Sequence, residues 1–316
     1  MKKIDSVMVA TDMSDYATLA ENRAAMLSQA LGLETLELIN VQDLSVIDML
    51  TRALKSSSEI ARKTLTEGLS SDLAGVVHRL ENAYRIHCEL TIRFGKAATE
   101  ISREIRDRKT GLLVVGAHGN DPSNNLFLGN LPSKLLQISP CPLLIVRQPP
   151  ERPYQKLLIA IDFSETSLYQ ARAALKLAAP EAEIVLLHAY EVPNEGIMRY
   201  ASVSQGLLHE FRSNIRQKAG AEMQEFISAL KAPHPVTSII QFGIPYSIIK
   251  EQAESKKPDL LVMGKHGRTR FEEFLLGSTT RNTLNETDCD ILIVPPAAVD
   301  RELGRDDAGL KKEDVA

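Results

Sequence analysis

The chain has no tryptophan and only three cysteines, and aromatic residues make up 5% of its 316 residues. Cys88, Cys141 and Cys289 form no C-x-x-C pair, so the sequence predicts neither a disulfide framework nor a zinc site. No run approaches the roughly 18 consecutive apolar residues of a membrane helix. Asp5 and Asp12 interrupt the first apolar stretch, which therefore lacks the core of a secretory signal. These absences favour a cytoplasmic protein that does not enter a membrane.

A strongly basic surface is also lacking. Lys and Arg number 37 against 41 for Asp and Glu, which gives a formal net charge of −4. This balance argues against a general nucleic-acid or anionic-membrane binder, so any bound phosphate must be held locally. Hydrophobic residues at 44% and charged residues at 25% are typical of globular proteins, and the length suits two domains of about 100 to 200 residues.

The second half of the chain repeats the first. Residues 9–14 (VATDMS) correspond to residues 159–164 (IAIDFS), and residues 115–119 (VGAHG) correspond to residues 263–267 (MGKHG). The period is far longer than the roughly 20 to 50 residues of solenoid repeats, so each copy should fold as a domain of its own.

A proline-rich break at residues 149–153 separates the two copies. It predicts a first domain at residues 1–148 and a second domain at residues 154–297. Residues 298–316 are charged and glycine-bearing, and we expect them to form a disordered tail.

Within each copy, short apolar runs alternate with amphipathic stretches, the pattern of β-α-β units that build a parallel sheet. The sequence therefore predicts an α/β fold of two tandem doubly wound domains, each an open five-stranded parallel sheet flanked by helices. The expected strands are Ser6–Ala10, Leu36–Val41, His87–Arg93, Leu112–Val115 and Leu143–Val146, then Lys156–Ile161, Glu183–Ala189, Val236–Gln241, Asp259–Met263 and Asp290–Val294. In the second copy, helices are expected from the cap Ser164 to Leu177, and at Gly206–Leu230, Tyr246–Ser255 and Thr279–Asn285. Ligands of such sheets bind beyond the carboxyl ends of the strands.

One loop of the second copy suits phosphate binding. It reads Gly264-Lys265-His266-Gly267, then nine residues, then Gly277-Ser278-Thr279-Thr280 where a helix is expected to begin. Glycines let backbone N–H groups approach an anion, and the start of a helix adds unpaired donors. The alternative is a tight turn with no ligand, which is the usual role of glycine after a strand.

The spacing G-x-x-G, nine residues, G-[ST] resembles the nucleotide loop of universal stress proteins. Asp162 after the first strand, the strand end Leu187-His188-Ala189 and the closing segment Ile291–Pro295 support the resemblance, which covers about Lys2 to Pro296. It implies a Rossmann-like, adenine nucleotide alpha-hydrolase-like fold and a stress-response protein that binds ATP or AMP, with or without magnesium. It places Ala160, Ile161, Asp162 and Ala189 at the adenine and ribose, and Met263, Gly264, His266, Gly267, Gly277, Ser278, Thr279 and Thr280 at the phosphates. Arg268 could reach a terminal phosphate or face solvent.

The first copy departs from this pattern. Gly116, His118, Gly119 and Gly129 keep the glycine framework and the nine-residue spacing, but Asn130 replaces the hydroxyl residue. Leu131-Pro132 follows, and the proline removes a backbone N–H from the start of the helix. We expect a retained turn with weakened phosphate binding, in which Asp12 and Val41 could still hold a nucleoside-like ligand weakly.

No P-loop G-x-x-x-x-G-K-[ST] is present, so the lysine and the magnesium ligand of an efficient NTPase are missing. We assign no catalytic residue and expect a non-catalytic or weakly hydrolytic nucleotide sensor. Two alternatives stay open: a slow ATP-hydrolysing or adenylate-transferring enzyme that uses the paired His118 and His266, and a scaffold with vestigial sites.

The closing strands of the two copies resemble those through which single-domain universal stress proteins pair. They predict pseudo-two-fold pairing of the two domains within the chain and allow a homodimer. A regulatory protein partner is expected, but the sequence does not identify it.

Overall fold

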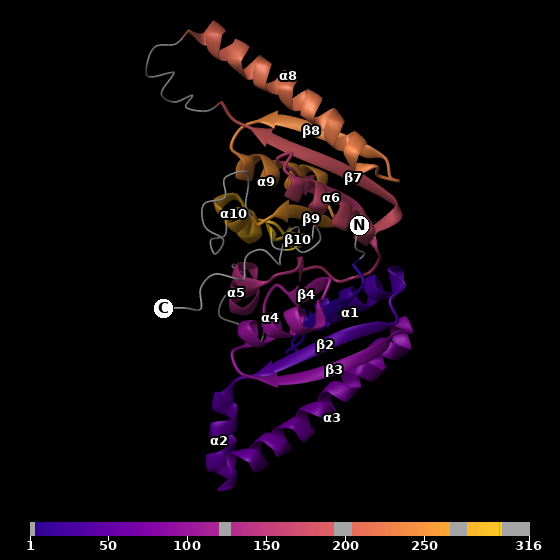
Figure 1. Cartoon of the computed structure of the whole chain (residues 1–316), viewed down its shortest axis with the longest axis vertical. Coiled ribbons are helices and arrows are strands. Elements are labelled where there is room, and N and C mark those ends of the chain that lie inside the picture. The colour runs from indigo at the N-terminus through magenta and orange to yellow at the C-terminus, as the bar shows by residue number, and fades with distance from the viewer. Residues whose placement is uncertain (1–3, 120–127, 193–203, 266–276, 297, 299–316) are drawn as a thin grey trace, which may run out of the picture. The chain divides into compact units, whose positions relative to one another are not determined.

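The computed structural model describes residues 4–119, 128–192, 204–265, 277–296 and 298. The chain divides into two compact units, the first running to Pro153 and the second beginning at Tyr154 (Figure 1). Each unit is a sheet with helices, in the order that the sequence predicts.

The first unit has five parallel strands in the spatial order β3-β2-β1-β4-β5. Its elements are β1 (Val7–Ala10), α1 (Asp15–Ala30), β2 (Thr35–Gln42), α2 (Leu44–Leu54), α3 (Ser58–Tyr84), β3 (His87–Phe94), α4 (Ala97–Arg108), β4 (Leu112–Gly116), α5 (Asn130–Ile138) and β5 (Leu143–Val146). Every residue of β1, β4 and β5 is buried, so the core lies around these strands.

The second unit repeats this arrangement with the order β10-β9-β6-β7-β8, again all parallel. Its elements are β6 (Tyr154–Ala160), α6 (Glu165–Leu177), β7 (Ala178–Tyr190), α8 (Gln205–Leu230), β8 (Val236–Phe242), α9 (Pro245–Lys256), β9 (Leu260–Gly264), α10 (Ser278–Glu286) and β10 (Asp290–Val294). The strand β6 takes the place of β1, and β9 takes the place of β4.

The strand order explains the helix layers. The chain moves one way across the sheet from β1 to β2 and β3, then returns to the other side with β4 and β5. Since crossovers are right-handed, α1 and α3 cover one face, and α4 and α5 cover the other. Contacts agree, because α1 packs on α3 and α4 on α5, while in the second unit α6 packs on α8 and α9 on α10. The direction of travel reverses between β1 and β4 and between β6 and β9, where such sheets open a crevice for a ligand.

The predicted fold is confirmed in both units, and the bounds of β5 and β10 agree to the residue. The predicted cap is also confirmed, since the Ser164 hydroxyl accepts a hydrogen bond from the Ser167 N–H over 3.1 Å. Most other predicted ends lie within two residues of the observed ones, and two features differ more. Helix α2 was not expected, and β7 begins at Ala178 instead of Glu183 because Tyr154 pairs with Ala178 beyond a register shift. Beyond Ala298, the predicted tail lies outside the described residues.

Candidate functional site

The second unit has a cavity of about 300 Å³ at the carboxyl ends of β6, β7 and β9. Eight of the predicted nucleotide contacts line it: Ala160, Ile161, Asp162, Ala189, Met263, Gly264, Thr279 and Thr280. Gly277 and Ser278 stand beside it as the cap and first residue of α10. His266, Gly267 and Arg268 lie outside the described residues. Sequence reasoning missed Ser164, Thr166, Ser167, Gln170, Leu187, His188, Pro245 and Ile249, which also line the cavity.

A strained turn holds Asp162 at the mouth of this cavity. Phe163 has a left-handed backbone with φ of 62°, a conformation that costs a non-glycine residue about 1 to 2 kcal/mol. Oδ1 of Asp162 accepts hydrogen bonds from the Ser164 N–H over 3.0 Å, the Ser164 hydroxyl over 2.6 Å and the Ser167 hydroxyl over 2.5 Å. These three donors fix the orientation of the carboxylate.

The first unit forms the same turn. Met13 has φ of 62°, and Oδ1 of Asp12 accepts a hydrogen bond from the Ser14 N–H over 3.1 Å. Ala17 stands where the second unit has Ser167, so the hydroxyl donor to the carboxylate is lost. Non-glycine residues with positive φ are concentrated at functional sites, and here the strain recurs after the first strand of both copies.

Side chains from α6 and β7 donate hydrogen bonds to the backbone carbonyl groups of the last residue of β6 and of the residue after it. Nδ1 of His188 lies 2.9 Å from the Ile161 carbonyl oxygen, and since a carbonyl only accepts, this nitrogen carries the proton. The His188 ring also stacks on Phe163, with 4.2 Å between the ring centres. Nε2 of Gln170 donates to the Ala160 carbonyl oxygen. These contacts set the shape of the cavity floor.

The two ends of the phosphate-type loop are tied together. The Gly277 N–H donates to the Lys265 carbonyl oxygen over 3.2 Å, and the buried Thr280 hydroxyl donates to the Gly264 carbonyl oxygen over 3.0 Å. The Thr280 hydroxyl hydrogen is therefore engaged by a backbone carbonyl group, while Thr280 also lines the cavity. Ser278 is exposed and Thr279 is half-buried, and their N–H groups lie in the first turn of α10, where donors lack intrahelical acceptors. This end of the cavity suits an anion.

The first unit has a larger cavity, of about 520 Å³, at the ends of β1, β2 and β4. It is lined by all seven residues predicted for the degenerate site: Asp12, Val41, Gly116, His118, Gly119, Gly129 and Asn130. Two glycines there have a packing role. A Cβ on Gly116 would lie 2.6 Å from the Tyr16 carbonyl oxygen, and one on Gly129 would lie 3.0 Å from the Ala117 carbonyl oxygen. These close contacts explain why both positions are glycine, without requiring a bound phosphate.

A network of hydrogen bonds around the buried Glu21 carboxylate supports the turn in the first unit. The Thr11 hydroxyl and the Arg79 guanidinium both donate to the Glu21 carboxylate, and Thr11 Oγ1 accepts from the Met13 N–H over 3.1 Å. Burial raises the pKa of Glu21, although its bonds with Thr11 and Arg79 oppose that shift. The second unit has Ile161 and Ala171 at the positions of Thr11 and Glu21, so it lacks the hydroxyl and the carboxylate that form this network in the first unit.

Neither a metal cluster nor a membrane span is found in the described part of the chain. No three His, Cys, Asp or Glu side chains there are grouped to hold a metal ion. No helix among those residues is long and apolar enough to cross a bilayer.

The universal stress protein family profile matches the chain twice, over residues 3–147 and 153–295. Universal stress protein MJ0577 of Methanocaldococcus jannaschii is 32% identical over 155 residues, which cover 45% of this chain and 94% of that protein. Universal stress protein E of Escherichia coli K12 is 23% identical over 308 residues, which cover 94% and 95%. The solved structure of a universal stress protein from Archaeoglobus fulgidus DSM 4304 has the same fold, with a TM-score of 0.63 and 17% identity over 92% of this chain and 98% of that chain. The chain therefore belongs to the universal stress protein family, with two of its domains in tandem.

Proposed function

We propose that the second unit binds an adenine nucleotide, ATP or AMP with or without magnesium, and that the protein acts as a cytosolic stress-response sensor or regulator. The observation that carries the proposal is the cavity of the second unit, which joins apolar strand ends to the N-terminus of α10. Such a cavity offers an apolar surface to a base and backbone donors to a phosphate.

The contacts suggest one orientation for the ligand. Ala189 and Ile249 supply an apolar wall for the base. Asp162, held by its serine donors, can accept hydrogen bonds from ribose hydroxyls. The phosphates would then lie against Gly264 and the first turn of α10, whose dipole favours negative charge.

We propose no catalytic residue. Among the described residues that line the cavity, Asp162 is engaged by three serine donors and His188 donates from Nδ1 to a backbone carbonyl. Both contacts shape the turn instead of activating a water molecule. Hydrolysis of bound ATP should therefore be slow, and nucleotide occupancy should act by changing the affinity for a regulatory partner or for a second copy of the chain.

A matched pair of substitutions tests where the nucleotide binds. Ser278 and Asn130 are the exposed first residues of α10 and α5, so Ser278→Asp and Asn130→Asp each add one carboxylate at equivalent helix starts. An acidic residue there also favours the helix, so both variants should remain folded. A carboxylate about 5 Å from a phosphate charge, at an effective dielectric of about 20 to 80, costs about 1 to 3 kcal/mol.

Calorimetric titration with ATP and magnesium should show at least about fivefold weaker binding for Ser278→Asp and unchanged binding for Asn130→Asp. Equal loss in both variants would contradict a site confined to the second unit, and no binding by the unaltered chain would favour the scaffold alternative. Thermal unfolding of both variants confirms that the comparison concerns folded protein.

A further inference from the structure

The second unit has a groove between α8 and the edge strand β8, separate from the cavity proposed for the nucleotide. Figure 1 shows α8 lying along β8, and the groove between them has a volume of about 550 Å³. The described residues that line it come from these two elements: Ser213, Arg216, Gln217, Gly220, Ser238 and Ile240. None of them lines the cavity at the ends of β6, β7 and β9, so the groove needs an explanation of its own.

The backbone of β8 has free hydrogen-bonding groups along this groove. Among the described strands, β8 is last in the order of its unit and pairs with β7, in continuous register over residues 236–242. Just beyond it, the Gly243 N–H donates to the Tyr190 carbonyl oxygen over 2.9 Å, so the odd-numbered residues bond to β7. Successive residues of a strand point in opposite directions, so the N–H and C=O groups of Ser238 and Ile240 point to the free edge.

The two edge strands of the chain differ in charge. Charged side chains on an edge strand discourage pairing with another chain. The first unit follows this rule, because its edge strand β3 carries Glu89 and Arg93, which pair with Arg108 and Glu104. In contrast, β8 reads VTSIIQF, which is uncharged and rich in β-branched residues. Its edge is therefore suited to accept a further strand.

The charge of the groove favours an acidic partner over a second copy of this chain. Arg216 is exposed, is the one charged residue among the described lining residues, and makes no hydrogen bond or ion pair within the described part of the chain. It lies beside Ser238 and Ile240, which flank the middle of β8. An antiparallel pair of β8 strands centred there would bring two Arg216 side chains toward its two-fold axis, where like charges repel. An acidic side chain would instead be attracted.

From these observations we infer that the edge of β8 binds an extended segment of a partner protein, one that carries an Asp or Glu side chain. The segment adds a strand to the sheet, and its main chain forms hydrogen bonds with Ser238 and Ile240. Alternate side chains of the segment enter the groove beside α8, where the acidic one pairs with Arg216. This inference does not depend on nucleotide binding in the second unit.

A random nonapeptide library displayed on phage and selected on the full chain supplies the probe. The selected peptides should carry Asp or Glu among alternating β-branched residues, and the strongest is synthesised for calorimetric titration. Arg216→Glu should weaken its binding about fivefold or more, because a repulsion replaces an attraction. Lys218→Glu is the matched control, since Lys218 is exposed on the same helix but does not line the groove, and binding should be unchanged. A peptide with Lys in place of its acidic residue should bind Arg216→Glu better than the original peptide does.

Methylation of the peptide backbone distinguishes strand addition from simple charge attraction. Methyl groups on the nitrogens of one alternate set of residues should abolish binding, because those N–H groups face β8, whereas methylation of the other set should leave it intact. The inference is overturned if no peptide is selected, if Arg216→Glu binds as well as the unaltered chain, or if the two methylated peptides behave alike. A dimer in sedimentation velocity that Ile240→Lys dissociates would assign the edge to a second copy and would also overturn it.

Discussion

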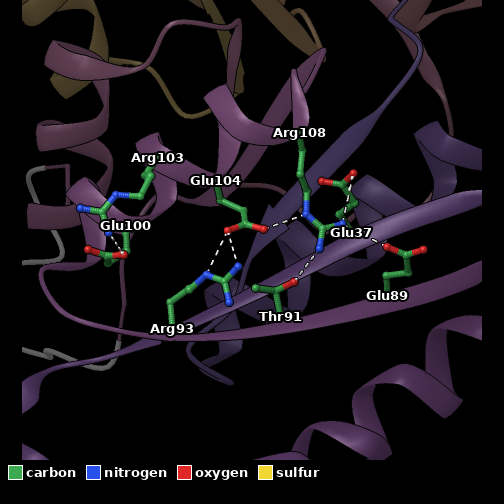
Figure 2. Close-up of polar contacts among 8 residues, drawn as sticks. All are labelled: Glu37, Glu89, Thr91, Arg93, Glu100, Arg103, Glu104 and Arg108. Atoms are coloured by element: carbon green, nitrogen blue, oxygen red, sulfur yellow. Dashed lines mark hydrogen bonds and ion pairs between the residues drawn. The ribbon is translucent and has the colours of Figure 1, made fainter.

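Arg108 connects α4 to β2 and β3 of the first sheet, and its removal should destabilise that unit in a pH-dependent way. Its guanidinium contacts Glu104 over 2.7 Å, Glu89 over 3.0 Å and Glu37 over 3.7 Å, and donates to the Thr91 hydroxyl over 3.1 Å (Figure 2). The Glu104 side chain is 6% exposed, so its carboxylate depends on protein partners.

The loss of free energy of unfolding can be estimated from the burial of the two charged groups. Removing one partner of a fully buried ion pair costs about 3 to 5 kcal/mol. Arg108 is 31% exposed, and Glu104 keeps a second partner in Arg93 at 2.8 Å, so solvent screening and this contact lower the cost. We expect Arg108→Met to lower the free energy of unfolding by about 2 kcal/mol at pH 7, or the melting temperature by about 4 to 8 °C.

The sign of the pH dependence follows from two carboxyl groups. Burial works to raise the pKa of Glu104, but the bonds and charges of Arg108 and Arg93 outweigh it and hold this pKa below its usual value. Its stabilisation is therefore present above about pH 4.3 and is lost as the pH falls through the folded pKa. Burial raises the pKa of Glu37, so its contribution is present in acid and is lost as the pH rises. Without Arg108, the protonated forms of both carboxyl groups are favoured in the folded protein. The difference in free energy of unfolding between Arg108→Met and the unaltered chain should therefore become smaller as the pH approaches 4.

The assay is urea unfolding of the full chain at pH 7, 5 and 4, followed by circular dichroism because the chain has no tryptophan. Arg103→Met is the control, since Arg103 is 61% exposed and pairs with Glu100 on the same helix. That change should cost no more than about 1 kcal/mol. The reasoning fails if Arg108→Met and Arg103→Met are equivalent, or if the Arg108→Met deficit is the same at every pH.

Three further predictions concern packing, backbone and thiol chemistry. Gly116→Ala should destabilise the first unit by about 1 to 3 kcal/mol in urea unfolding, because the new Cβ would lie 2.6 Å from the Tyr16 carbonyl oxygen; an unchanged midpoint would contradict this. Met13→Gly should be neutral or stabilise by up to about 1 kcal/mol, because Met13 is 39% exposed with φ of 62°; a clear loss of melting temperature would show a packing role. Burial raises the pKa of Cys88 to about 11, so iodoacetamide at pH 8 should label this thiol in unfolded protein and spare it in folded protein, as mass spectrometry can show.

The periodic parts of the fold could be predicted from the sequence. Strands such as β5 and β10 are short apolar runs bounded by a proline at one end and a charged residue at the other, so local composition marks their ends. The start of β7 could not be predicted in this way. Ala178 to Ala182 is rich in alanine with one proline, and the strand there exists because Ala178 pairs with Tyr154 in a neighbouring strand. That pairing is a tertiary contact.

The candidate site was predictable where loop spacing marks it, as at Asp162 and Gly264. Ser167 and Gln170 were missed because they lie on α6, where serine and glutamine are ordinary helix residues, and only the folded unit brings them to the end of β6. The contacts of Arg108 with Glu37 were missed for the same reason, since the two residues belong to different elements far apart in sequence. His188 carried a usable signal, because it precedes Ala189 at the end of a strand that borders the cavity.

The most direct test of nucleotide binding in the second unit is photolabelling of the full chain with 8-azido-ATP, followed by proteolysis and mass spectrometry. The azide marks the position of the base, so label should appear in peptides containing the end of β7 near Ala189 or the start of α9 near Ile249, and excess ATP should remove it. Label confined to the first unit, or label that excess ATP does not reduce, would contradict the proposed site.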